Sequence, residues 1–244
     1  MTPVGVVFDV DDTLYLECDY VRSGFRAVAQ RVAWSASVDP DSVFRFLWTR
    51  FETGQRGSSF DELLQQFVTE PDRMSVADLV RTYREHRPTI HLLPGMRSIL
   101  RDLHCRGVPL GVISDGPFVS QTAKVLALDV REYVSAVLLT DSWGREFWKP
   151  HTRAFVEMSL KLSLPPDHLV YIADNPSKDF EAPALLGWRS VRLRLPGQVH
   201  NNSQAHGANP DHTVESVSAL RGLLSHWAPI PHTQPRGRPG LSGD

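Results

Sequence analysis

Two carboxylates at the beginning of the chain have the spacing of a catalytic pair. Asp9 and Asp11 stand two positions apart, directly after the apolar run 4–8. In an extended chain, side chains two positions apart point to the same side. Two neighbouring carboxylates can act as a nucleophile and as a general acid/base in group transfer. Because Asp and Thr also cap helices, this motif alone leaves a structural role open.

A second acidic motif follows another apolar run. Asp174 and Asp179 come after residues 170–173. Converging carboxylates repel each other unless a cation lies between them. Mg²⁺ prefers oxygen ligands and is the usual cation beside phosphate groups. If the two motifs meet in the fold, they predict a Mg²⁺ site.

Two further segments supply groups that can hold phosphate oxygens. Ser114, Asp115 and Gly116 end the apolar run 110–113, and a hydroxyl with flexible backbone amides suits a phosphate. The same tripeptide also forms ordinary turns. Lys149 follows a third run, at 136–139. A lysine is commonly a solvated surface charge, so its role depends on where the fold places it.

Short apolar runs alternate with helical patterns and determine where these residues lie. The predicted strands span residues 4–10, 110–113, 136–139, 170–173 and 190–195. The helices predicted between and after them span 96–106, 119–126, 154–162 and 180–186. This alternation predicts a Rossmann-like α/β fold with a parallel sheet, in which functional residues gather at the carboxyl ends of the strands.

The segment 16–93 interrupts the alternation and has only helical patterns. One helix is predicted over 20–36, others begin near Pro40 and Ser59, and Ser75 with Asp78 forms a capping box before a fourth. We expect an inserted helical subdomain at 16–93, with residues 1–15 and 94–228 forming the core. The polar segment 198–210 predicts a surface loop, and the Pro- and Gly-rich residues 229–244 predict a disordered tail.

The composition excludes several classes of protein. Twenty-six Lys and Arg residues against 28 Asp and Glu residues give a net charge of −2, which argues against a nucleic-acid partner. No apolar run approaches the ~20 residues that a membrane span needs. Cys18 and Cys105 do not form a disulfide framework, and no secretory signal pattern is present. We expect a cytoplasmic monomer or homodimer that binds a small molecule.

Taken together, the motifs resemble those of the haloacid dehalogenase-like superfamily of phosphohydrolases. The resemblance rests on the Asp9-x-Asp11-x-Thr13 signature, on Ser114, on Lys149, and on the acidic motif at 174–179, in that order and at strand ends. It covers residues 4–225. The insertion after the first motif is similar to the helical type 1 cap of that superfamily. The resemblance implies a Rossmann-like core with an all-helical cap.

The resemblance also implies a role for each site residue. Asp9 would be the nucleophile that forms an aspartyl-phosphate, and Asp11 would protonate the leaving group, activate water and touch Mg²⁺ through its carbonyl. Lys149 would bind the phosphoryl group and hold Asp9. The implied phosphate-binding residues are Ser114, Asp115, Gly116 and Lys149. The implied metal ligands are Asp9, Asp11, Asp174 and Asp179, the last directly or through another ligand.

These roles predict a Mg²⁺-dependent phosphohydrolase that acts on a small phosphomonoester, such as a sugar phosphate or a nucleoside monophosphate. A phosphomutase or a dehalogenase on the same fold remains an alternative, as does a non-catalytic phosphate sensor. Asn175 stands where some members carry a second Asp, which makes Asp179 more important. Side chains of the insert that could select the leaving group, or simply lie on its surface, are Tyr20, Arg22, Arg50 and Arg56.

Overall fold

The computed structural model describes residues 5–55, 57–69, 74–201, 203 and 207–227. Six strands form one parallel sheet: β1 (Gly5–Phe8), β2 (Leu110–Ser114), β3 (Ala136–Leu139), β4 (Leu169–Ala173), β5 (Arg189–Leu193) and β6 (His212–Val214). The strand order is β3-β2-β1-β4-β5-β6. Because β1 lies between β2 and β4, the segments that follow these three strands emerge side by side. The predicted parallel α/β sheet is confirmed.

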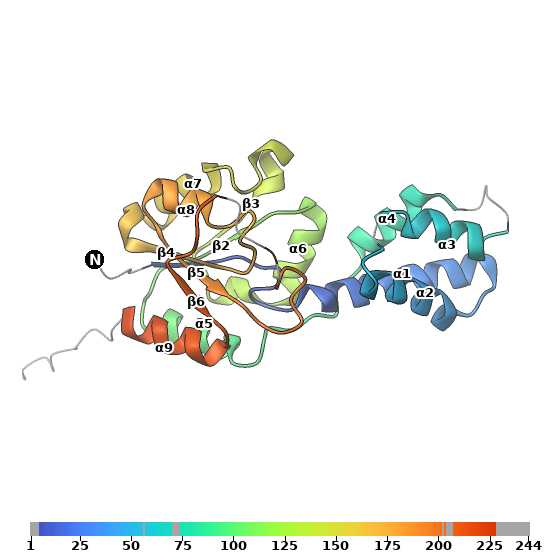
Figure 1. The fold of residues 1–244 in the computed structure, drawn as a ribbon, viewed down its shortest axis with the longest axis horizontal. Coiled ribbons are helices and arrows are strands. Elements are labelled where there is room, and N and C mark those ends of the chain that lie inside the picture. Colours follow the sequence, from blue (N-terminus) through green and yellow to red (C-terminus); the bar gives the residue numbers. More distant parts are fainter. Residues whose placement is uncertain (1–4, 56, 70–73, 202, 204–206, 228–244) are drawn as a thin grey trace, which may run out of the picture.

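Helices cover both faces of the sheet, as Figure 1 shows. They are α5 (Met96–Cys105), α6 (Phe118–Ala127), α7 (Arg153–Leu162), α8 (Glu181–Leu186) and α9 (Val217–Trp227). Successive residues of β1 face opposite layers, since Val6 and Phe8 belong to one apolar cluster and Val7 to the other. The first cluster includes α5 and α9, and the second includes α7 and α8. The core therefore has two apolar layers.

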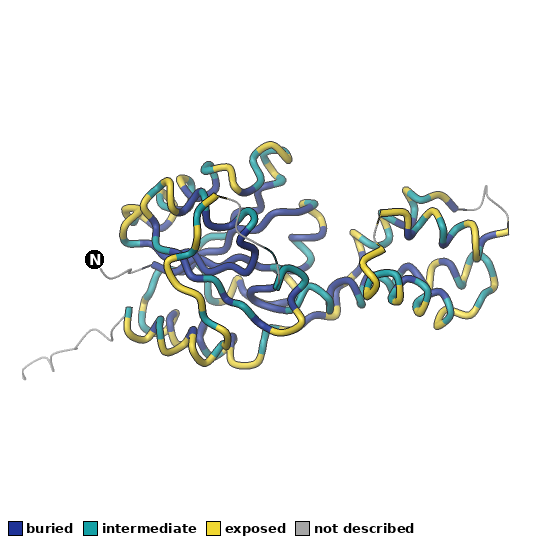
Figure 2. The backbone as a smooth tube through the Cα atoms, viewed as in Figure 1, coloured by how far each residue is buried: buried dark blue, intermediate teal, exposed yellow. Residues whose placement is uncertain are grey.

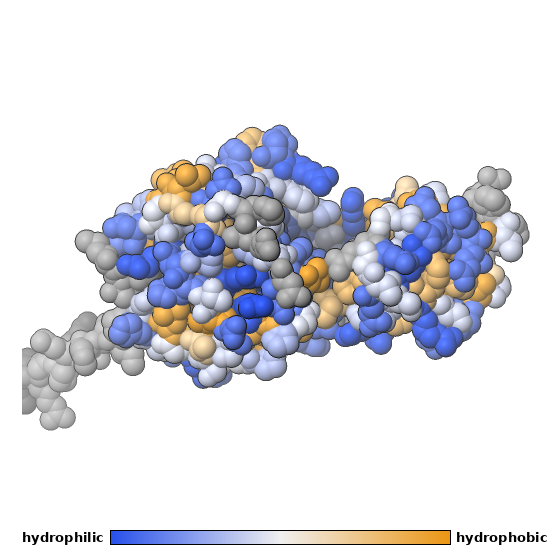
Figure 3. All heavy atoms as spheres, viewed as in Figure 1, coloured by the Kyte–Doolittle hydropathy of each residue, from blue (hydrophilic) through white to orange (hydrophobic). Residues whose placement is uncertain are grey.

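Four helices form a separate unit next to the carboxyl ends of the strands (Figure 1). They are α1 (Glu17–Ala36), α2 (Pro40–Glu52), α3 (Ser59–Phe67) and α4 (Val76–Glu85). Their buried side chains form an apolar cluster distinct from those of the sheet. Figure 2 marks buried residues along these helices in dark blue. Figure 3 shows apolar side chains at the surface where this unit meets the sheet.

Local sequence signals explain where several helices begin and end. Ser75 and Asp78 form the predicted capping box of α4, because each side chain accepts a hydrogen bond from the backbone of the other. Asp39 accepts hydrogen bonds from two backbone amides at the start of α2. Gly107 and Gly187, after α5 and α8, have positive φ, which glycine adopts at little cost.

Some elements escaped prediction. Strand β6 is only three residues long and lies at the edge of the sheet with His212 and Thr213 exposed, so it has no apolar pattern. Short 3₁₀ turns, also without a sequence signal, are η2 (Val130–Glu132), η3 (Thr140–Trp143), η4 (Arg145–Phe147) and η5 (Pro166–His168). The predicted tail at 229–244 lies outside the described residues. Within the described part of the chain, no helix is both long and apolar enough to cross a bilayer.

Candidate active site

A buried lysine connects the carboxylates at the strand ends. The Nζ atom of Lys149 lies 2.6 Å from Oδ1 of Asp9 and 2.7 Å from Oδ1 of Asp179. It also donates a hydrogen bond to the hydroxyl of Tyr171, at 2.8 Å. The Lys149 side chain has no solvent exposure. The structure therefore makes it a fixed charge between the two acidic motifs, and not a solvated surface lysine.

Three carboxylates form a group that can hold a cation. Asp9, Asp174 and Asp179 each offer an oxygen atom, and these atoms lie within 4.8 Å of one another. Oδ2 of Asp174 is buried and has no hydrogen-bond partner among the described residues. Oδ2 of Asp179 accepts a hydrogen bond from the Asn175 amide, at 3.0 Å. An all-oxygen set with an unpartnered buried oxygen fits a hard divalent ion such as Mg²⁺.

The pKa shifts of this group also favour a bound cation. Burial raises the pKa of Asp9 to about 7, an effect that Lys149 opposes and Asp179 reinforces. Burial, with the charges of Asp179 and Asp9, raises the pKa of Asp174 well above its usual value. Burial alone would lower the pKa of Lys149, but Asp179 and Asp9 outweigh it and raise that pKa. The positive charge of Lys149 therefore does not balance the negative charge of the three buried carboxylates, and a metal ion would supply the missing positive charge.

The Asp11 carboxylate faces α6. Nζ of Lys124 lies 2.7 Å from Oδ1 of Asp11, and Gln121 donates a hydrogen bond to Oδ2, at 2.8 Å. The hydroxyl of Tyr15 also donates to Oδ1. Burial would raise the pKa of Asp11, but Lys124 outweighs it through its charge and its hydrogen bond, so the pKa is lowered. The side chain is thus held as a carboxylate, outside the three-carboxylate group.

Gln121 packs against the segment that follows β2. Ser114 donates a hydrogen bond to Oε1 of Gln121, at 3.0 Å, so Gln121 joins Ser114 to Asp11. Gly116 has a φ of +124°, and a Cβ atom there would lie 2.6 Å from Nε2 of Gln121. Only glycine fits this backbone and leaves Gln121 in place.

Asp115 positions the lysine. Its carboxylate accepts hydrogen bonds from the hydroxyl of Thr140, at 2.7 Å, and from the backbone amide of Lys149, at 3.2 Å. Nζ of Lys178 lies 3.4 Å from the same carboxylate. A carboxylate repels a phosphate, so any contact of Asp115 with substrate phosphate would come from its backbone amide.

Comparison with known proteins identifies the family. Residues 6–192 match the sequence model of the haloacid dehalogenase-like hydrolases. This chain belongs to that family. It is similar to a glyceraldehyde 3-phosphate phosphatase from Methanocaldococcus jannaschii, with 27% identity over 228 residues that cover 91% of this chain and 97% of the relative. The chain is thus a phosphoric monoester hydrolase of the haloacid dehalogenase type.

Solved structures share the fold. The hydrolase YfnB from Bacillus subtilis, in a form bound to magnesium, aligns with a TM-score of 0.62 and 17% identity over 94% of this chain and 100% of its own. L-2-haloacid dehalogenase from Xanthobacter autotrophicus aligns with a TM-score of 0.57 and 17% identity over 92% of this chain and 99% of its own. At this identity, the likeness shows the fold alone.

Asp12 joins the start of α1 to the segment after β5, which lies far away in the sequence of this hydrolase. It is buried with a φ of +53°, and its carboxylate accepts hydrogen bonds from the amides of Glu17, at 2.7 Å, and Val199, at 2.6 Å. Gln198 is also buried and donates to the Asp12 carbonyl, at 2.7 Å. The predicted surface loop at 198–210 was therefore wrong at Gln198. The side-chain amide of Gln198 is buried because it forms hydrogen bonds with buried backbone groups.

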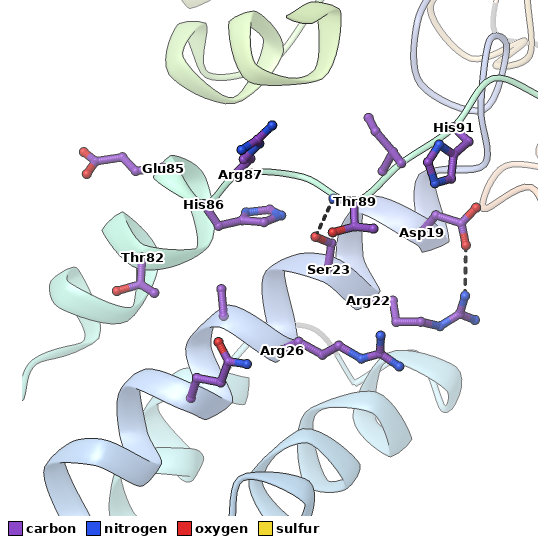
Figure 4. Close-up of a pocket in the computed structure, with 13 residues that line it drawn as sticks. Asp19, Arg22, Ser23, Arg26, Thr82, Glu85, His86, Arg87, Thr89 and His91 are labelled. Carbon is purple, nitrogen blue, oxygen red and sulfur yellow. Dashed lines mark hydrogen bonds and ion pairs between the residues drawn. The ribbon is translucent and has the colours of Figure 1, made fainter. Parts of the chain in front are cut away.

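The insert side chains that could select the leaving group, or simply lie on the surface, have partners within the insert where the structure describes them. The Tyr20 hydroxyl donates to a backbone carbonyl of α4, at 3.4 Å, and Arg50 pairs with Glu62 of α3, at 2.6 Å. Arg22 pairs with Asp19 at 2.9 Å, beside the cavity of about 780 Å³ in Figure 4. Arg56 lies outside the described residues.

Proposed function

We propose that this chain hydrolyses a small phosphomonoester with Mg²⁺ bound at the strand ends, by way of an aspartyl-phosphate on Asp9. The observation that carries the proposal is the position of the Lys149 ammonium, which contacts Asp9 and Asp179. Beside them lies the Asp174 oxygen that has no hydrogen-bond partner in the described part of the chain. This arrangement combines a nucleophile, a fixed positive charge and an oxygen site for a cation, which are what phosphoryl transfer requires.

The residues of the site can divide the reaction into two steps. In the first, an oxygen of Asp9 attacks phosphorus, the bond from phosphorus to the leaving oxygen breaks, and Asp11 supplies the proton that this oxygen needs. In the second, Asp11 removes a proton from the water that attacks phosphorus, the bond from phosphorus to the Asp9 oxygen breaks, and inorganic phosphate leaves the regenerated carboxylate. In this structure, Lys124 and Gln121 hold Asp11 as the carboxylate, which is the form that accepts this proton. Donation in the first step requires a protonated Asp11, freed from Lys124.

Four groups would bind the phosphoryl oxygens: the Ser114 hydroxyl, the Lys149 ammonium, and the backbone amides of Asp115 and Gly116. The metal ligands would be the carboxylates of Asp9, Asp174 and Asp179, with the Asp11 carbonyl. Bound Mg²⁺ would neutralise charge that develops on the phosphoryl group. The conformation of Gly116, and the hydrogen bond that the Lys149 backbone amide donates to the Asp115 carboxylate, would keep the donors in place.

The helical unit would act as a cap. We assign residues 16–93 to this cap and residues 1–15 and 94–228 to the core, because α1–α4 stand next to the strand ends (Figure 1). Closure of the cap would exclude bulk water while Asp9 attacks. The likeness to the glyceraldehyde 3-phosphate phosphatase from Methanocaldococcus jannaschii supports a sugar phosphate as the substrate, and a nucleoside monophosphate has the same reacting group.

A panel assay tests the proposal. Phosphate release from glyceraldehyde 3-phosphate, other sugar phosphates and nucleoside monophosphates is measured with Mg²⁺ and again with EDTA. We expect release that requires the metal and is absent from Asp9→Asn. Release that persists in EDTA or in the purified variant would contradict the proposal. Recovery of an isomerised phosphate ester would indicate a phosphomutase, and halide release from a haloacid would indicate a dehalogenase.

A further inference from the structure

The backbone at Asp12 has a conformation that its surroundings must hold in place. Its φ of +53° lies in the left-handed region, which Asp tolerates better than most residues but adopts only at a cost. Asp12 directly follows Asp11, whose carbonyl is one of the Mg²⁺ ligands proposed above. Because φ is the rotation about the N–Cα bond of Asp12, it sets the direction of the Asp11 carbonyl relative to the rest of Asp12. Strained backbone of this kind persists only where neighbouring contacts determine it.

Gln198 supplies such a contact at the Asp12 carbonyl. Its side chain is buried, and Nε2 donates hydrogen bonds to the carbonyls of Asp12, at 2.7 Å, and Leu193, at 2.9 Å. Its Oε1 atom accepts a hydrogen bond from the backbone amide of Leu195, at 2.6 Å. Both protons of the side-chain amide and its oxygen atom therefore have backbone partners. This one side chain joins the carboxyl end of β5 to the loop that follows β1.

The segment after β5 also holds the Asp12 carboxylate. The backbone amide of Val199 donates to one of its oxygens, at 2.6 Å, and that of Glu17, at the start of α1, donates to the other, at 2.7 Å. With the bond from Gln198, three hydrogen bonds fix Asp12, and two of them come from residues 195–201, which we call the β5 loop. Because β4 lies between β1 and β5, this loop reaches past the end of β4 to make them.

Arg192 connects the β5 loop to a second proposed Mg²⁺ ligand. It stands opposite Ala173 in the pairing of β5 with β4, next to the position of Asp174. Nε of Arg192 donates a hydrogen bond to the Asp174 carbonyl, at 3.1 Å. Nη2 donates to the carbonyls of His200, at 3.3 Å, and Asn201, at 3.2 Å. The planar guanidinium, with donors in fixed directions, thus holds Asp174 and the end of the β5 loop together.

We propose that the β5 loop positions two ligands of the Mg²⁺ site, with Gln198 and Arg192 as the positioning residues. Gln198 fixes the Asp11 carbonyl through its bond to the next residue, Asp12. Arg192 fixes Asp174 through the carbonyl of that residue. The proposal rests on the function proposed above and adds a third strand to its metal site, because the ligands themselves follow β1 and β4. Replacing groups that orient metal ligands from outside lowers the affinity for the metal by about 10–100-fold.

The test measures Mg²⁺ binding to the metal-free full chain by calorimetry. Gln198→Met keeps a side chain of similar length but loses all three hydrogen bonds of the amide, so we expect the Kd for Mg²⁺ to rise by about tenfold or more. Arg192→Met should also raise this Kd, because it loses the bond to the Asp174 carbonyl. Arg192 is only partly buried, so its variant tests the proposal even if Gln198→Met loosens the core.

Ser190→Ala is the matched control. Ser190 is buried in the same strand, and its hydroxyl donates to the Asp211 carboxylate and accepts from the Asp211 amide, both at 3.2 Å. These bonds lie near the amino-terminal end of β5, away from the carboxyl ends of the strands. Ser190→Ala should therefore lower the Tm in EDTA and leave the Kd for Mg²⁺ unchanged. Melting curves in EDTA for all three variants separate a loss of stability from a loss of metal affinity.

The Mg²⁺ requirement of turnover gives a second readout. Gln198→Met should need about tenfold more Mg²⁺ for half-maximal phosphate release, and saturating Mg²⁺ should restore most of its kcat. A Kd within about twofold of the wild-type value in either variant would remove that residue from the metal site, and in both variants it would overturn the proposal. An equal rise of the Kd in Ser190→Ala would overturn it too, because the effect would then be one of stability.

Failure of the proposed hydrolysis would look different, because calorimetry needs no turnover. If Gln198→Met weakens the binding of Mg²⁺ while the wild type releases phosphate from no phosphomonoester, the hydrolase proposal fails and the positioning role stands. If phosphate is released and both variants bind Mg²⁺ like the wild type, the positioning role alone fails. A wild type that binds no Mg²⁺ would overturn both.

Discussion

Lys149 is the residue for which the structure adds most to what the sequence allows. The sequence alone allows an ordinary surface lysine, whereas the structure buries its ammonium between Asp9 and Asp179. The same packing explains why Tyr171 belongs to the site: its hydroxyl accepts a hydrogen bond from Lys149 inside the second apolar layer. Tyr171 lies within a predicted strand, and nothing in its local sequence distinguishes it from other core residues.

Replacing Lys149 by alanine tests this placement. We expect Lys149→Ala to lower kcat by about 10²-fold or more, because a fixed charge at the transferring group is lost. Lys161→Ala, at an exposed lysine of α7, is the control and should behave as the wild type. Steady-state phosphate release at saturating Mg²⁺ gives both values. A kcat within twofold of the wild type would remove Lys149 from the reacting centre.

Gly116 gives a second test at this scale. Its φ of +124° and the 2.6 Å approach of a Cβ atom to Gln121 predict that Gly116→Ala lowers the free energy of unfolding by about 1–3 kcal/mol. Gly222→Ala is the matched control, because a Cβ there meets nothing within 4 Å and alanine suits the interior of α9. Chemical denaturation measures both. Equal effects of the two substitutions would contradict the strain at Gly116.

At the scale of elements, most strands and helices could be predicted from local patterns. The run 136–139 matches β3 residue for residue, and the capping box at Ser75 was predicted from its spacing. Strand β6 could not be predicted, because its stability comes from pairing with β5 at the sheet edge and not from an apolar pattern. The exposed ends of an element carry less sequence information than its buried centre.

The capping box makes a prediction for α4. The Ser75 hydroxyl accepts a hydrogen bond from the Asp78 amide, so Ser75→Ala should lower the free energy of unfolding by about 1 kcal/mol. Ser58 occupies the corresponding position of α3 without a capping bond, so Ser58→Ala should have a smaller effect. Urea titrations of the two variants compare them. A larger loss in Ser58→Ala would contradict this account of α4.

At the scale of the whole molecule, the fold assembles contacts that no local pattern contains. The predicted parallel sheet gathers functional residues at the carboxyl ends of its strands, and the observed order β2-β1-β4 brings the acidic motifs together. The contact of Lys124 with Asp11 spans 113 positions, and that of Val199 with Asp12 spans 187. Spacing along the chain says nothing about such pairs, because they depend on how a helix and a loop pack around the sheet.

The buried carboxylates predict how pH and Mg²⁺ act on stability. The pKa of Asp9 rises from 3.8 to about 7 in the metal-free fold. Because the pKa of Asp9 is higher in the folded than in the unfolded chain, Asp9 contributes stability that is fully present at pH values below the unfolded pKa of 3.8. This contribution is lost as the pH rises from about 4 to 7. Mg²⁺, which binds the ionised form, should therefore raise the Tm more at pH 8 than at pH 5. Melting curves at both pH values test this, and equal shifts would contradict it.

The central claim is that Asp9 carries the phosphoryl group during turnover. The most direct measurement is rapid acid quenching of the Mg²⁺-loaded enzyme during hydrolysis of a substrate found in the panel, followed by mass spectrometry of its peptides. The account predicts a phosphorylated peptide with the modification on Asp9, and none in Asp9→Asn. Phosphate on any other residue, or none while phosphate is being released, would contradict it.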